Sequence, residues 1–158
     1  MTPAMGSGVG RTRREERGAA AVEFALVVPF LLLILFGILS YGFMLSFRQA
    51  LSQGAAEGAR AAAVSVSTTT TSRTAAAVSA LDASLDLYGV SCSGGSLVKD
   101  GATVGTCSLS IAPCPNDTAV DCATLEVDYQ YADHPLLPDF PFVPLPDSLQ
   151  YTAVARVS

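Results

Sequence analysis

The chain has 158 residues, of which 50% are hydrophobic and only 15% are charged, against about 25% charged residues in a typical soluble domain. This composition excludes a chain that is disordered throughout. The net charge of −5 argues against a nucleic-acid binder, which would carry a basic face. With one His and no phosphate-binding loop or G-x-S-x-G motif, the sequence predicts no catalytic residue, no metal site and no cofactor.

The charges divide the chain into three parts. Residues 1–18 carry four Arg and two Glu, whereas residues 61–158 carry three basic and ten acidic side chains. Between these parts, residues 19–47 contain one ionisable side chain, Glu23. We therefore expect a basic leader, an apolar segment and an acidic body, in that order.

The apolar segment is long enough to cross a membrane. Residues 24–47 carry no charge, and as a helix they would span about 36 Å, which exceeds the roughly 30 Å hydrocarbon core. They are apolar on every side, so an amphipathic surface helix is not expected. A secretory signal peptide has a shorter apolar region of about 7–15 residues, although small residues at 54–59 leave cleavage there open as an alternative.

The flanking charges orient this segment. Arg residues next to a membrane span stay on the cytoplasmic side. The leader carries four Arg, and Arg48 alone follows the segment closely. We expect a single-pass protein with its N-terminus inside and its body outside the cytoplasm.

The junction between leader and apolar segment carries the most specific signal. It reads RGAAAVEFALVVPF over residues 17–30, in which Gly18 ends the basic leader and Glu23 follows five residues later, directly before Phe24. This order resembles the processing site of type IV prepilins. More closely, residues 17–64 resemble the TadE-like family, whose members are minor pseudopilins of the tight-adherence (Flp) pilus system.

The resemblance implies a processing site, a location and a set of partners. A prepilin peptidase would cut between Gly18 and Ala19, with Glu23 and Phe24 as further recognition residues. The protein would lie in the bacterial cytoplasmic (inner) membrane with other pseudopilins, the major pilin and the inner-membrane pilus assembly platform. Glu23 would pair with the N-terminal amine of a neighbouring subunit, unless it extends to the lipid headgroups without a role. The alternatives are a pseudopilin of a secretion system and an uncleaved membrane-anchored extracytoplasmic binding module.

The helix is expected to continue beyond the membrane. Residues 47–64 are rich in Ala and contain no Pro, which predicts one helix from about residue 19 to about residue 64. Gly54, Gly58 and Ala62 recur every four residues and form a small-residue stripe that allows close helix approach. The stripe would serve subunit pairing or packing on the protein's own sheet, and the sequence leaves both open.

The rest of the chain predicts an α+β body over residues 73–158. The Thr-rich run at 65–72 is typical of a linker. A short amphipathic helix should follow at 73–88, with Asp82 and Asp86 on its polar face and Gly89 at its end. Alternating apolar residues predict strands of a small antiparallel sheet at 104–111, 124–131 and 149–157.

A proline-rich loop separates the last two predicted strands. Residues 134–146 contain five Pro and are excluded from a central strand. The loop displays four large apolar side chains, Leu136, Leu137, Phe140 and Phe142. It would cover the sheet, touch the membrane surface or dock a partner, and covering the sheet is the simplest of the three.

The four Cys residues all lie in the part expected outside the cytoplasm, where an even number predicts disulfides. They are Cys92, Cys107, Cys114 and Cys122. Three pairings are possible, and we favour Cys92–Cys107 with Cys114–Cys122 because each closes a short local loop. A zinc site is the alternative, but its ligands are usually spaced C-x₂₋₄-C, and the intervals here are 15, 7 and 8 residues.

Overall fold

The computed structural model describes residues 9–67, 69–138 and 144–157, with side chains from residue 18 onward. The chain divides into two compact units, Met1–Leu39 and Ser40–Ser158. The fold is α+β, as predicted: a long N-terminal apolar helix, a second helix and a five-stranded antiparallel sheet.

Helix α1 runs from Val9 to Ala63 and passes through both units. It therefore begins within the predicted leader, ten residues before the expected start at residue 19, and ends one residue before the expected end at 64. Pro29 lies inside the helix, where it removes one backbone donor without ending the helix. The Ala- and Leu-rich sequence on both sides favours helix strongly enough to continue past it.

Helix α2 spans Thr70–Leu85 and passes into the short 3₁₀ helix η1 at Asp86–Tyr88. It begins three residues earlier than predicted because the side chain of Thr69 caps it and accepts a hydrogen bond from the Ser72 backbone N–H. The Thr-rich run is thus partly helical, and the connector between the two helices is shorter than the 65–72 linker that was expected. Gly89, at a φ of 66°, ends η1 as predicted.

The sheet follows the chain order β1-β2-β3-β4-β5, and every neighbouring pair is antiparallel. Its strands are β1 (Val90–Ser93), β2 (Ser96–Lys99), β3 (Ala102–Cys114), β4 (Asp117–Tyr129) and β5 (Leu149–Arg156). The three predicted strands are present as β3, β4 and β5, although β3 and β4 are longer than expected. The β1–β2 hairpin was missed, and its signal is the two-residue loop Gly94-Gly95, in which both residues have positive φ.

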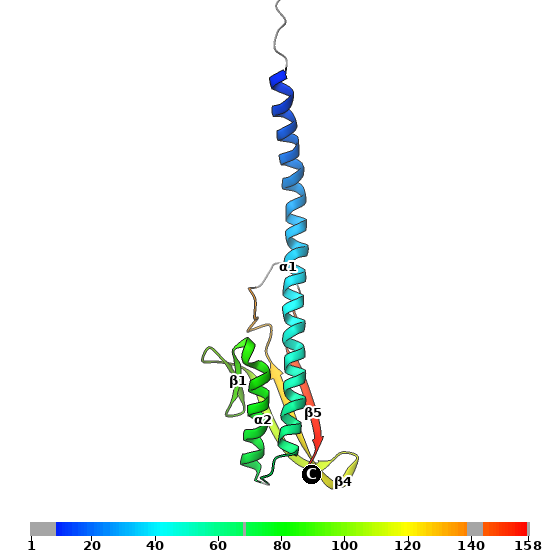
Figure 1. Cartoon of the computed structure of the whole chain (residues 1–158), viewed down its shortest axis with the longest axis vertical. Coiled ribbons are helices and arrows are strands. Elements are labelled where there is room, and N and C mark those ends of the chain that lie inside the picture. Colours follow the sequence, from blue (N-terminus) through cyan, green and yellow to red (C-terminus); the bar gives the residue numbers. More distant parts are fainter. Residues whose placement is uncertain (1–8, 68, 139–143, 158) are drawn as a thin grey trace, which may run out of the picture. The chain divides into compact units, whose positions relative to one another are not determined.

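The core lies between the sheet and the two helices, which run side by side over one of its faces (Figure 1). Phe47 and Leu51 of α1 are fully buried, and the Phe47 ring lies 4.8 Å from that of Tyr129 on β4 and 4.9 Å from that of Tyr88. Edge-to-face aromatic contacts of this kind add to the area that they bury. The second unit is therefore closed by α1 as well as by its own helix α2.

The small-residue stripe of α1 packs inside this unit. A Cβ atom at Gly54 would lie 2.8 Å from Leu81 of α2, and one at Gly58 would clash with Leu125 of β4 and lie 3.0 Å from a backbone oxygen of α2. Ala62 is fully buried. Of the two roles left open by the sequence, these contacts support packing within the protein's own body, because α2 and β4 occupy the stripe.

The packing of the stripe predicts that two glycines of α1, one inside the stripe and one outside it, respond differently to substitution by Ala. Gly58→Ala should destabilise the body by about 1–3 kcal/mol through overpacking, since the buried Leu125 side chain and the backbone of α2 would both have to shift. Gly42→Ala, where a Cβ meets nothing within 4 Å, should be neutral or stabilising by up to about 1 kcal/mol from helix propensity. Thermal unfolding of both variants in detergent micelles measures the difference, and equal effects would contradict the packing described here.

The burial of Tyr129 leads to a second prediction, on how the free energy of unfolding changes at alkaline pH. Its hydroxyl donates a hydrogen bond to the His134 carbonyl at 2.8 Å. Burial raises the pKa of this hydroxyl from 10.0 to about 12, with a smaller contribution from the nearby Tyr131. The unfolded chain therefore releases this proton at lower pH than the folded chain, so the stabilisation is complete below about pH 10 and is lost toward pH 12. Urea unfolding between pH 9 and pH 12 should show this decline, and Tyr129→Phe should flatten it. An equal decline in the variant would refute the assignment to Tyr129.

Candidate functional site

The predicted processing residues all lie on the exposed surface of α1. Gly18, Ala19, Glu23 and Phe24 are exposed, Phe24 by 71%. Glu23 follows Ala19 by four residues, which places the two one helical turn apart on the same side. The bond between Gly18 and Ala19 is part of the helix, whereas an extended backbone is expected at a peptidase cleft. Any cleavage there requires the helix to open locally.

The apolar segment is not covered by the rest of the protein. Among the described residues, one helical stretch, Gly18–Ala63, is long and apolar enough by length and composition to cross a membrane. None of its most apolar 18-residue window is buried. A core helix of a soluble protein would be mostly buried, so the exposed apolar side chains here favour a lipid environment.

The body is held by the two disulfides that the sequence analysis favours. Cys92–Cys107 links β1 to β3 with Cα atoms 6.1 Å apart, and Cys114–Cys122 links the end of β3 to β4 with Cα atoms 4.9 Å apart. No Cys is left free as a zinc ligand. In the chain-entropy model the two loops contribute about 3 and about 2.5 kcal/mol respectively. Such bonds persist in oxidising compartments.

Sequence reasoning missed a polar contact behind the first disulfide. Asp82 of α2 was expected on the polar face of its helix, but its carboxylate accepts a hydrogen bond of 2.6 Å from the Cys92 backbone N–H. A charged acceptor makes this bond stronger than a neutral one. It fastens α2 to the edge strand β1, and no feature of the α2 sequence distinguishes Asp82 from the exposed Asp86 in this respect.

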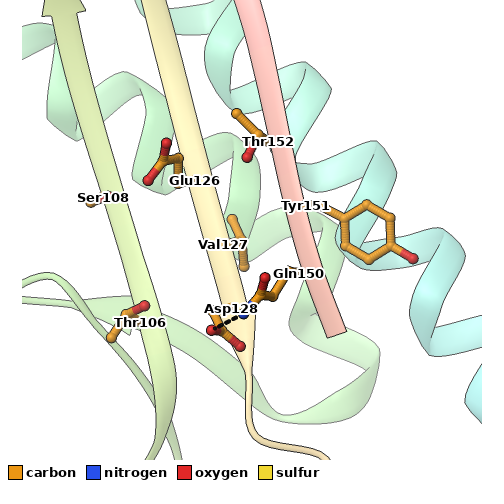
Figure 2. A pocket seen from close by; sticks show the side chains of 8 residues that line it. All are labelled: Thr106, Ser108, Glu126, Val127, Asp128, Gln150, Tyr151 and Thr152. Carbon is orange, nitrogen blue, oxygen red and sulfur yellow. Dashed lines mark hydrogen bonds between the residues drawn. The ribbon is translucent and has the colours of Figure 1, made fainter. Parts of the chain in front are cut away.

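The face of the sheet away from the helices carries a shallow polar hollow (Figure 2). Asp128 of β4 accepts a hydrogen bond of 2.7 Å from the Gln150 amide of β5, and Thr106 of β3 is its cross-strand partner on the other side. Glu126 adds a second carboxylate. The eight described residues that line the hollow include no His, Lys or Cys. It therefore offers negative charge and hydrogen-bonding groups, and its lining contains no cationic side chain.

The proline-rich loop is described at its two ends. Leu136 and Leu145 pack against the core, and the Tyr41 hydroxyl of α1 donates to the Pro144 carbonyl at 2.7 Å. These contacts support the interpretation that the described ends of the loop cover the core. Phe140 and Phe142, which were singled out from the sequence, lie outside the described residues.

Comparison with known proteins places the informative segment in one family model. Residues 18–60 match the model described as TadE-like protein. The match begins at Gly18, includes Glu23 and the whole apolar segment, and ends at Arg60 on the part of α1 that packs on the body. Searches of curated proteins and of solved structures found no match.

Proposed function

We propose that this chain is a non-catalytic TadE-type pseudopilin that serves the assembly of tight-adherence pili. The observation that carries the proposal is the coincidence of the TadE-like match with the uncovered apolar stretch of α1. The family model covers the helix, while the disulfide-bonded body lies outside it. The body is then the part that distinguishes this chain from others that share the helix.

The location follows from charge and redox chemistry. The Arg-rich leader favours a cytoplasmic N-terminus in the bacterial inner membrane, and the two disulfides favour a body outside the cytoplasm. The two arguments are independent and give the same orientation. The partners in this proposal are a prepilin peptidase, other pseudopilins, the major pilin and the inner-membrane assembly platform.

Processing is proposed between Gly18 and Ala19. Gly is about 1 kcal/mol less favourable than Ala within a helix, so Gly18 marks a point where α1 opens at low cost. The absence of a side chain also lets the backbone enter a narrow cleft. A cut here would leave Ala19 with a free amine, one turn before Glu23.

Glu23 is proposed to direct subunit pairing. A carboxylate inside a membrane span costs up to about 3 kcal/mol near the centre and less near the edge. A cationic partner, such as the free amine of a neighbouring mature chain, offsets that cost. Removing one partner leaves a buried charge uncompensated, which favours one register of neighbouring helices over others.

One experiment separates processing from pairing. Unaltered protein, Glu23→Gln and Glu23→Ala are expressed in cells that contain the matching peptidase, and each is scored for its N-terminal residue by mass spectrometry and for co-purification with the pilus machinery. We expect all three to begin at Ala19. Co-purification of both variants should fall at least about tenfold, which corresponds to about 1.4 kcal/mol.

The matched control is Glu57→Gln, which removes an exposed carboxylate of the same helix from its surface pair with Arg60. It should leave both readouts unchanged, because exposed pairs contribute little. Intact residues 1–18 on membrane-extracted protein would contradict processing and favour the uncleaved binding module. Unchanged capture of both Glu23 variants would refute the pairing role.

A further inference from the structure

A large apolar side chain is exposed where the body begins. Leu87, the central residue of η1, is 87% exposed. Of the described residues outside α1, the other large apolar side chains with comparable exposure are Val64, Val66 and Val154. Val64 and Val66 belong to the connector that precedes α2, at the opposite end of that helix from Leu87. Leu87 has no packing role in the body that would explain it.

The contacts of Tyr88, the residue after Leu87, show which part of α1 lies beside η1. The Tyr88 ring lies 5.7 Å from that of Phe43 and 4.9 Å from that of Phe47, and its hydroxyl is hydrogen-bonded to Ser46 at 2.7 Å. η1 is thus level with residues 43–47 of α1. On this stretch Phe43 and Leu45 stay 41% and 49% exposed.

The length of the apolar run places this level at the membrane boundary. A hydrocarbon core of roughly 30 Å takes about 20 helical residues, so a span that starts after Glu23 ends near Phe43. The uncharged run nevertheless continues to residue 47. Met44 and Phe47 are 7% and 0% exposed under the body. Ser40 is 5% exposed as well, so burial of α1 within the body begins at the last residues of a span of this length.

We propose that this end of the body enters the headgroup region of the outer leaflet and that Leu87 inserts among the lipids there. The inference rests on the membrane anchoring in the proposed function. The surrounding groups suit such an interface, because Tyr41, Phe43 and Tyr88 form the mixture of apolar and hydroxyl-bearing rings that favours the headgroup level. Phe43 and Leu45 of α1 are exposed at the same level, where the uncharged run ends, and this makes lipid, rather than another protein, the occupant.

The chemistry of the lipid follows from charge. Asp86, directly before Leu87, is exposed, and residues 61–158 carry ten acids against three basic side chains. An anionic surface would repel this body. Zwitterionic phospholipid is therefore the surface that Leu87 fits.

The chain has no Trp, so a single Trp reports its own position without background. We would place Leu87→Trp in phosphatidylcholine vesicles and compare them with vesicles whose acyl chains are brominated close to the glycerol. Bromine quenches Trp emission on contact. The expected result is a blue-shifted emission that is lost in the brominated vesicles and does not depend on the protein-to-lipid ratio.

Two variants calibrate this result. Val66→Trp replaces a fully exposed residue, separated from the level of Leu87 by helix α2, which is about 24 Å long, and it should show no loss of emission. Phe30→Trp, in the middle of the apolar run, should be quenched by lipids brominated deep in the chain. If Phe30→Trp is quenched and Leu87→Trp is not, the body stands clear of the membrane and this inference fails while anchoring survives. If neither is quenched, anchoring itself fails.

Because Trp itself prefers interfaces, the unaltered Leu87 needs its own readout. Its methyl resonances, assigned by their loss in Leu87→Gln, should broaden with lipid that carries a nitroxide near the glycerol. Absence of broadening would overturn the proposal even if Leu87→Trp were quenched. A blue shift without quenching would also overturn it, because the side chain would then be covered by protein.

Discussion

One continuous helix has to satisfy two different environments, and the organisation of the chain follows from that constraint. From residue 24 to residue 39, α1 carries no charge, and its most apolar window is uncovered. In its second part, apolar burial is confined to one stripe, from Met44 through Leu51 to Ala63. A helix suits this double role because it satisfies its backbone hydrogen bonds within itself, in lipid as in protein.

The second part of α1 sets how the body is built. Gly54 and Gly58 allow α2 and β4 to approach the helix backbone closely, and Phe47 fills the space beside Tyr129. The sheet alone would leave this face open to water. The Asp82 hydrogen bond then fastens α2 to β1, while one disulfide joins β1 to β3 and the other joins β3 to β4. The body is thus built onto the second part of α1, whose buried residues belong to its core.

Much of this arrangement is predictable from the sequence, and the misses have physical causes. The apolar run and the alternation in β4 depend on periodicity, which the sequence displays directly. The start of α2 was misplaced because Thr69 acts as a cap, which the unfavourable helix propensity of a Thr run conceals. The role of Gly54 and Gly58 stayed ambiguous because a small-residue stripe fits an internal and an external partner equally well. The choice depends on Leu81 and Leu125, which are distant in sequence.

The processing junction stands differently. Its residues can be identified in the sequence by their order. They lie on an exposed surface of α1. Their roles depend on a peptidase and on neighbouring subunits, so the fold of one chain carries little information about them. The separation between lipid-dependent and body-dependent parts of α1 is, by contrast, a property of this chain alone.

Hydrogen–deuterium exchange of the full chain in phosphatidylcholine nanodiscs measures that separation most directly. The body is unfolded with urea and a disulfide reductant while the bilayer stays intact. The account predicts that amides of residues 51–63 lose protection together with those of β4, because a short helix without tertiary packing is marginal in water. Amides of residues 24–39 should stay protected by lipid. Joint loss of protection across both parts of α1, or persistent protection of residues 51–63 after β4 has exchanged, would contradict the account.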